Sequence, residues 1–391
     1  MGWPSDPTRK YVGPLRGLKV VDLSRIIAGP LTSLYLADLG ADVIKVERPT
    51  GDEMRGYGPS KWQGVGTTFL AINRNKRSMV LDLNRAEERE ILLELLADAD
   101  VLIESFRPGI MTRWGLDDAS LREVNPRLIF CSITGFGSDG PAAGLGANNL
   151  IAEAFGGSTS VSAEIQASRL RTGPPMTDFF TGTSTALAIM AAVMLREQTG
   201  EGSRVTSSLL ESQTTMVSAY ILGYLATGVD PSPEAGLPFT VPNQSFTAGD
   251  GLKFVLAVNS EDMWQRMCRA IDKPEWLERP EYASNALRMQ RQQEIIEQLD
   301  AIVAERPRDH WIAAFAEQRV TASPINSVAQ LVAHPQFAEL ELLQDMTGGD
   351  IKGLRTVRPP FSISGLPWSE VPHVAPPALG ADTDTIKEAL R

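Results

Sequence analysis

Strand-like and helix-like segments alternate along the first half of this 391-residue sequence, and the alternation restricts the fold strongly. The run GLKVVDLS around Leu18 predicts a strand, AGPLTSLYLADLG with its closing Gly40 predicts a helix, and ADVIKVE predicts a second strand. Further strands are predicted for SMVLDLN, DVLIESF and RLIFCSITGFG, and an amphipathic helix for EEREILLELLADA. This pattern predicts an α/β fold with a doubly wound, Rossmann-like parallel sheet, which binds ligands at the carboxyl ends of its strands.

The later part of the sequence indicates a second, smaller α/β domain. The segment GVDPSPEAGLPFTVPNQ is dense in Pro and Gly, which is typical of a crossing between domains. After it, LKFVLAV predicts a strand, and polar amphipathic helices follow around DMWQRMCRAI, RQQEIIEQLDAIVAE and DHWIAAFAEQ. We therefore expect a large domain over 1–205, a linker over 206–244, a small domain over 245–325, and a return segment over 326–391 that completes the large domain.

Charge and cysteine content restrict the partners of the chain. A net charge of -11 and a pI near 5.0 argue against nucleic acid or an anionic membrane surface, because both favour a basic patch. We find no run of about 18 apolar residues that would predict a membrane span. Cys131 and Cys268 lie far apart and give neither a metal-binding spacing nor a disulfide framework. We expect a cytoplasmic protein without a bound metal.

Histidine is the usual general base at neutral pH, yet the sequence contains only three. His310 and His334 lie on helical patterns, and His373 lies in a Pro-rich tail. We interpret all three as structural or exposed, which disfavours a His-based triad. A carboxylate is therefore the better candidate for a reactive group.

Asp178, in the stretch PPMTDFFTG, is the carboxylate with the most unusual position. It opens a long helical pattern dominated by Ala, Thr, Gly and Met, which predicts a buried helix. Free N–H groups and the helix dipole at this end should keep the side chain ionised. A poorly solvated carboxylate can attack an activated acyl group. The same position is equally typical of a plain N-cap, so the residues alone leave both interpretations open.

Basic residues cluster after the predicted strands, which is informative in an acidic protein. Because strand ends and helix starts gather at one edge of the sheet, the cluster indicates an anionic, phosphate-bearing ligand. A solvated charge run remains the alternative. The glycine-rich GFGSDG, over 135–140, matches no phosphate-binding motif. The basic residues are Arg48, Arg74, Lys76, Arg77, Arg107 and Arg113.

Several ordered stretches together resemble the class III coenzyme A transferase family, the CaiB/BaiF or formyl-CoA transferase-like group. The resemblance runs over nearly the whole chain, and AGDGLKFVLAVNSEDMWQRMCRAI resembles the family's small domain. The other stretches are GLKVVDLSRIIAGP, LADLGADVIKVERPTGDEMR, NRNKRSMVLDLN, ADVLIESFRPGIMTRWGL, NPRLIFCSITGFGSDGP, TGPPMTDFFTG and REQTGEGSRV.

The resemblance implies that the protein moves CoA from an acyl-CoA donor to a carboxylic acid acceptor by a ping-pong path. Asp178 would attack the thioester to form a mixed anhydride, and CoA would then convert it to an aspartyl-CoA thioester. Acyl-CoA would be a substrate, with no other bound cofactor. The family also forms interlocked homodimers, with the active site between the large domain of one chain and the small domain of its partner.

The resemblance also assigns CoA contacts to this sequence. Arg48 would face the adenine, and Arg113 would contact phosphate. The CoA channel would be lined by Leu81, Phe106, Ile110 and Trp114. The backbone segment beside the pantetheine and the reacting thioester would be formed by Ile26, Ile27 and Ala28.

Three departures from the family pattern limit these assignments. Asn148 and Asn149 stand where family transferases often carry an acid and where its racemases place a His-Asp pair. Asparagine cannot accept an α-proton, which disfavours an acyl-CoA racemase or isomerase, the first alternative function. A glycine run typical of oxalate-using members is also absent, so oxalate is a disfavoured acceptor. A non-catalytic acyl-CoA binding protein is the second alternative.

The sequence does not identify the acyl group or the acid. Specificity must come from a few side chains around the thioester, because CoA itself supplies most of the contact area. The candidates by location are Leu31, Asn148, Asn149, Phe239 and Gln244.

Overall fold

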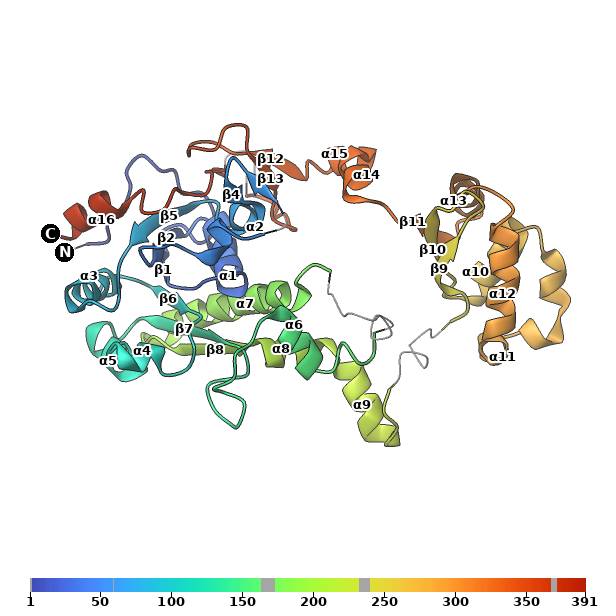
Figure 1. Cartoon of the computed structure of the whole chain (residues 1–391), viewed down its shortest axis with the longest axis horizontal. Helices are drawn as coiled ribbons and strands as arrows, with labels where there is room; N and C mark the ends of the chain where they lie inside the picture. Colours follow the sequence, from blue (N-terminus) through green and yellow to red (C-terminus); the bar gives the residue numbers. More distant parts are fainter. Residues whose placement is uncertain (1, 59, 163–172, 232–239, 367–370) are drawn as a thin grey trace. The chain divides into compact units, whose positions relative to one another are not determined.

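The computed structural model describes residues 2–58, 60–162, 173–231, 240–366 and 371–391. The chain divides into two compact units, which are considered separately (Figure 1). The large unit comprises Met1–Pro233 with Glu341–Arg391, and the small unit comprises Glu234–Leu340. Both contain helices and a sheet, so the predicted α/β class is confirmed.

A six-stranded parallel sheet forms the centre of the large unit. Its strand order is β5-β2-β1-β6-β7-β8, so the chain starts in the middle and extends outward in both directions. This is the Rossmann-like arrangement, which places a ligand crevice where the order reverses between β1 and β6. The strands are β1 Lys19–Asp22, β2 Asp42–Glu47, β5 Lys76–Val80, β6 Val101–Glu104, β7 Ile129–Thr134 and β8 Arg204–Ser208.

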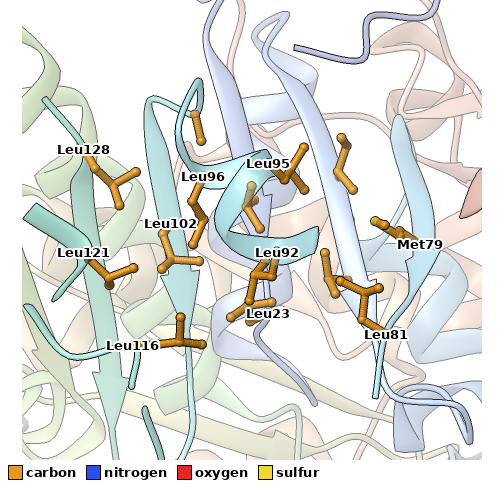
Figure 2. Packing of buried hydrophobic residues seen from close by; sticks show 14 of the residues in the cluster. Leu23, Met79, Leu81, Leu92, Leu95, Leu96, Leu102, Leu116, Leu121 and Leu128 are labelled. Carbon is orange, nitrogen blue, oxygen red and sulfur yellow. The ribbon is translucent and has the colours of Figure 1, made fainter. Parts of the chain in front are cut away.

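Helices cover both faces of this sheet. On one face, the leucines of α3 share a buried cluster with Met79 and Leu102 of the strands and with Leu23, which follows β1 (Figure 2). On the other face, α1 and α7 pack on strand residues that include Val20 and Ile103. The remaining elements are short connections around these layers. The helices are α1 Ala28–Asp38, η1 Glu53–Arg55, α2 Thr67–Ile72, α3 Ala86–Leu96, α4 Ile110–Arg113, α5 Asp118–Val124, α6 Asn149–Phe155, α7 Met176–Thr199, α8 Leu209–Met216, α9 Ser218–Thr227 and α16 Thr383–Leu390, and the short strands are β3 Lys61–Trp62, β4 Val65–Gly66, β12 Leu343–Asp345 and β13 Arg355–Val357.

The sixth strand and the two helices after it differ from the sequence expectation. β8 has the polar sequence RVTSS and lies at the edge of the sheet, where a strand needs no continuous apolar run. The linker predicted over 206–244 therefore begins inside β8 and contains α8 and α9. The Pro- and Gly-rich signal that suggested the linker starts only at Gly228, after α9 ends.

Helix α7 is long and apolar enough to cross a membrane by length and composition, a test that core helices also pass. Its polar Thr and Ser residues explain why no apolar run was found in the sequence. In the structure, Ile189 and Ala192 of α7 belong to the core, and Arg196 forms an ion pair with Asp100 at 2.9 Å. Its first turn carries Asp178.

The C-terminal segment returns to the large unit and closes one edge of the sheet. The Ser78 N–H donates to the Asp382 carboxylate at 2.8 Å, and the Asp382 N–H donates to the Ser78 carbonyl at 2.9 Å. The Val80 N–H donates to the Thr383 hydroxyl at 3.0 Å. These bonds satisfy backbone groups of β5 that an open sheet edge would leave unpaired.

The small unit contains a three-stranded antiparallel sheet, ordered β11-β10-β9, with helices packed against it. Aromatic residues dominate its core, where the rings of Trp264 and Trp276 stack at 5.9 Å. Residues 326–340, predicted as part of the return segment, belong to this unit. Its elements are β9 Asn243–Thr247, β10 Lys253–Ala257, α10 Glu261–Ala270, η3 Pro274–Glu278, η4 Pro280–Tyr282, α11 Asn285–Gln290, α12 Gln292–Val303, α13 Arg308–Glu317, β11 Thr321–Pro324, α14 Val328–Ala333 and α15 Pro335–Glu339.

Within the large unit, α1 and α7 approach closely at a glycine. A Cβ atom on Gly182 would lie 2.7 Å from the Ala28 carbonyl oxygen and 3.0 Å from the Leu31 side chain. The Thr32 hydroxyl also donates to the Gly182 carbonyl at 3.1 Å. Because Asp178 lies one turn before Gly182 on α7, this contact places Asp178 near the start of α1.

We expect Gly182→Ala to lower the thermal unfolding midpoint. Overpacking costs about 1–3 kcal/mol, which exceeds the gain of about 1 kcal/mol from removing a helical glycine. Thr183→Ala, at the next and exposed position, is the control and should change the midpoint little. Differential scanning calorimetry of both variants measures the difference, and equal midpoints would contradict the close contact.

Candidate active site

Asp178 is a buried carboxylate in the first turn of α7, with 9% of its surface exposed. Among the described residues its side chain has no cationic partner within ion-pair distance. Burial raises the pKa of Asp178 to about 7, and the negative charge of Glu153 adds to the effect. The carboxylate is therefore poorly stabilised in its charged form, which is the condition for a reactive oxygen nucleophile.

The helix end does not stabilise Asp178 as the sequence predicted. The side-chain oxygen of Asn149 accepts the N–H groups of Thr177 at 3.0 Å and of Asp178 at 3.3 Å. It thereby occupies donors of the first turn that would otherwise bind a carboxylate. The expectation that Asp178 stays ionised is wrong in direction, because burial and the negative charge of Glu153 raise the pKa of Asp178.

Asp178 lies in the wall of a cavity of about 670 Å³ in the large unit. The predicted thioester segment, Ile26 to Ala28, lies in the same wall, at the start of α1. Asn148 also lines this cavity. The structure therefore brings the predicted nucleophile and the predicted thioester segment to one space.

A second cavity of about 320 Å³ shares the side chains of Arg25, Phe106 and Arg107 with the first. The ring of Phe106 packs edge-on against Trp114, with centroids 5.2 Å apart. The two cavities therefore adjoin, and residues at the carboxyl ends of β1, β2 and β6 line them. All of the remaining predicted CoA contacts line the second cavity: Arg48, Leu81, Phe106, Ile110, Arg113 and Trp114.

The loop between β1 and α1 carries backbone strain at the site. Ile26 has φ of 71°, a left-handed conformation that is rare for a β-branched residue. The Ile26 N–H points to the Asp52 carboxylate at 3.5 Å, and Lys45 pairs with Asp52 at 3.0 Å. Ile27 precedes α1 without a side-chain cap, so the first N–H groups of this helix remain available at the cavity.

A buried ionic network supports this loop from below. Asp22 and Lys76 are completely buried and lie 3.2 Å apart. The ammonium of Lys76 also donates to the Pro30 carbonyl at 2.8 Å, and that of Lys45 donates to the Ser24 carbonyl at 2.8 Å. Burial alone would raise the pKa of Asp22, but these two lysines and neighbouring hydroxyl groups lower it to about 2.

Three of the six basic residues predicted to bind a ligand have structural roles instead. Lys76 belongs to the network above, Arg74 pairs with Asp38, and Arg77 pairs with Asp42 at 2.8 Å, all of them buried. They lie at the start of a strand and not after its end, because β5 begins at Lys76. The other three, Arg48, Arg107 and Arg113, line the cavities.

The charges at the cavity walls are partly compensated. Glu53 accepts Arg25 and Arg48, each at 2.8 Å. Arg107 forms no ion pair with the described residues, and its guanidinium lies 3.3 Å from the position of a Cβ on Gly146. An unpaired guanidinium in a cavity wall can bind an anionic group of a ligand.

The sequence did not identify three residues of the site. Arg25 lines the cavity, Asn149 accepts backbone N–H groups of α7, and Glu153 accepts a hydrogen bond from Asn149. The Asn-x-x-x-Glu spacing on a short helix was the available signal, since positions four apart share a helix face. Of the specificity candidates, Leu31 is buried at the contact between α1 and α7, and Phe239 lies outside the described residues. Gln244 belongs to β9 of the small unit.

No histidine lines either cavity in the described part of the chain. The same part contains no group of three or more His, Cys, Asp or Glu side chains suited to a metal ion. Cys131 and Cys268 are buried free thiols, and burial raises the pKa of both. The reactive candidate of this site is therefore the carboxylate of Asp178.

Comparison with known protein families matches residues 15–383 to CoA-transferase family III. The chain belongs to this family. Among its relatives, human succinyl-CoA:glutarate CoA-transferase is 33% identical over 97% of this chain and 87% of that protein. Succinyl-CoA:mesaconate CoA-transferase of Haloarcula marismortui is 35% identical over 87% of each chain.

Solved structures agree with the family assignment. A CAIB/BAIF family protein from Brucella suis superposes with a TM-score of 0.85 and 32% identity, covering 97% of this chain and all of the other. Acetyl-CoA:oxalate CoA-transferase of Acetobacter aceti, a further relative, is 32% identical over 95% of this chain and 94% of that protein. The predicted family, fold and CoA-transferase function are thus confirmed. The substrates of this class are acyl-CoA and a carboxylic acid.

For this CoA-transferase, we expect Lys76→Met to destabilise the large unit by about 3–5 kcal/mol, because it leaves Asp22 buried without its closest cation. The low pKa of Asp22 gives stability that is present above about pH 4 and is lost as pH falls towards 2. The difference in free energy of unfolding between Lys76→Met and wild type should therefore become smaller in acid. Urea unfolding between pH 3 and 7 measures it, with the exposed Lys352→Met as control. A loss independent of pH would contradict this role.

Proposed function

We propose that this protein transfers CoA through covalent intermediates on Asp178. The observation that carries the proposal is the position of a buried, unpaired carboxylate in the same cavity wall as the start of α1. Its pKa of about 7 leaves a reactive fraction of carboxylate at neutral pH.

The proposed reaction has four steps. A carboxylate oxygen of Asp178 attacks the thioester carbonyl, the C–S bond breaks, and CoA leaves as thiolate, which gives a mixed anhydride. The thiolate then attacks the Asp178 carbonyl, the acyl group leaves as a carboxylate, and an aspartyl-CoA thioester remains. Third, the acceptor carboxylate attacks the carbonyl of this thioester, the C–S bond breaks, and CoA leaves as thiolate, which gives a second anhydride. Fourth, the thiolate attacks the acceptor's carbonyl in this anhydride, which releases the new acyl-CoA and the Asp178 carboxylate.

The start of α1 supports these steps as a site for the developing oxyanion. Ala28 and Gly29 line the cavity, and the helix has no side-chain cap. Backbone N–H groups fixed at a helix terminus stabilise negative charge without reorganisation. The strained Ile26 directs the chain into this turn.

The second cavity supports the placement of CoA. Its aromatic pair, Phe106 and Trp114, offers an apolar wall for pantetheine, while Arg48 and Arg113 offer charge to the nucleotide end. We propose these contacts for acyl-CoA as substrate, with no other cofactor required for the chemistry.

We propose acids with a second carboxylate as substrates. The relatives are named for succinyl, glutarate and mesaconate groups. Arg107 lies in the wall shared by the two cavities and has no ion-pair partner among the described residues, so it is available to such a carboxylate.

We expect Asp178→Asn to abolish covalent labelling by acyl-CoA, because the amide is a far weaker nucleophile. Intact mass after mixing with succinyl-CoA should show an adduct in wild type that hydroxylamine removes. Butyryl-CoA, which lacks the second carboxylate, should label more slowly. Asp345→Asn, at an exposed pair with Arg355, is the matched control. An adduct in Asp178→Asn would refute the assignment, and exchange of an α-proton with deuterated water instead of an adduct would favour an isomerase.

We propose that the protein is a homodimer. The short helix α14 has no buried residue, and Val328, Leu331 and Val332 on it are exposed, which is typical of a surface that a second chain covers. Light scattering after size exclusion should give twice the mass of one chain at micromolar concentration. A single-chain mass under these conditions would exclude the dimer.

We also propose a reducing, cytoplasmic location, which suits two free cysteines.

A further inference from the structure

Glu153 is a buried acid beside the candidate nucleophile, and the proposed steps give it no task. It lies on α6 with 8% of its surface exposed and forms no ion pair with the described residues. A buried carboxylate without a cation costs free energy, so its presence needs an explanation. Such groups are concentrated at functional sites.

Hydrogen bonds connect Glu153 to the first turn of α7. The Asn149 amide N–H donates to Glu153 Oε1 at 2.8 Å, while its carbonyl oxygen accepts the N–H groups of Thr177 and Asp178. Only the oxygen end of a carboxamide can accept backbone N–H groups, so Glu153 determines which way Asn149 faces.

A second chain of donors reaches the same oxygen. Gln213 donates to the Thr177 hydroxyl, and that hydroxyl lies 3.4 Å from Glu153 Oε1, to which it can donate. With Asn149, two donors converge on one oxygen of Glu153, as expected for an ionised carboxylate. The negative charge of Glu153 thus lies beside Thr177, the residue that precedes Asp178 on α7.

Other charged groups around Asp178 do not take this role. Glu211 lies on α8, which packs against α7, and Glu53, Arg25 and Arg107 lie in the walls of the cavity. The Glu211 carboxylate accepts a hydrogen bond from the hydroxyl of Ser208, the N-cap residue of α8. The charge of Glu53 is neutralised by two arginines. Glu153 alone among these acids contributes to the raised pKa of Asp178.

We propose that Glu153 is a positioning residue for acyl transfer: it orients Asn149 against α7 and disfavours the free carboxylate of Asp178 relative to its covalent acyl forms. The inference rests on the proposed function. In the anhydride and in the aspartyl-CoA thioester, Asp178 carries no charge, so the repulsion from Glu153 disappears when either forms. Glu153 thereby shifts the equilibrium between the free Asp178 carboxylate and the covalent intermediates toward the intermediates.

Glu153→Gln tests the charge, because glutamine keeps an oxygen that can accept from Asn149. In wild type, the rate of adduct formation with succinyl-CoA should rise with pH through about 7. In the variant, the inflection should move about 1 pH unit lower, and the fraction of enzyme in the adduct at equilibrium should fall about tenfold. Glu197→Gln, an exposed position at the other end of α7, controls for the change in net charge. An unchanged inflection and adduct fraction would overturn the proposal.

Glu153→Asp tests the position and provides a second variant if Glu153→Gln does not fold. Aspartate keeps the charge but is too short to hold Asn149 in place. The inflection should stay near that of wild type while adduct formation slows about tenfold or more. A wild-type rate in this variant would overturn the positioning role.

A chemical titration separates this inference from the proposed function. A water-soluble carbodiimide with glycine ethyl ester modifies protonated carboxyl groups, and peptide mass spectrometry reads its yield at Asp178 without acyl-CoA. The yield should fall at lower pH in Glu153→Gln than in wild type. Coincident curves would overturn the role of Glu153 even if adducts form, whereas absent adducts with separated curves would refute only the covalent path.

Discussion

Helices α1 and α7 approach each other closely because Gly182 presents no side chain to the Ala28 carbonyl. The nucleophile candidate lies one turn before this contact, and the uncapped start of α1 lies directly beside it. The parallel sheet beneath holds both helices in fixed positions, with its carboxyl edge at the cavities. The site therefore depends on backbone packing, and only its chemistry depends on the side chains that line it.

Much of the large unit could be predicted from the sequence, because buried parallel strands are continuous apolar runs. Five strands, the long helix and the place of Asp178 at its start follow from such patterns. β8 could not be found in this way, since an edge strand exposes polar residues. The state of Asp178 could not be found either, because Glu153 and Asn149 come from α6, a short helix without a strong periodic pattern. Burial and distant neighbours, not local sequence, set its charge.

The acidic composition gives basic residues two separate uses. Arg74, Lys76 and Arg77 compensate buried aspartates and so hold the strands and the β1–α1 loop together. The remaining arginines line the cavities, where they are available to the strongly anionic ligand that we propose. Because the net charge of -11 repels such a ligand at long range, attraction must arise within a few ångströms of the site. A cluster of basic residues in the sequence does not show whether they pair with buried aspartates or line a cavity. Their burial in the structure does show it.

The pairing of Ser78 and Val80 with Asp382 and Thr383 has a consequence for how the chain is made. A ribosome releases β5 before the small unit, but it releases the edge partners of β5 only after the whole small unit has emerged. The edge of β5 in the nascent large unit thus stays unpaired while the small unit, which has its own core, is synthesised. Completion of the sheet therefore follows synthesis of the small unit, and a chain cut between the small unit and Asp382 keeps an unpaired sheet edge that can associate with other chains.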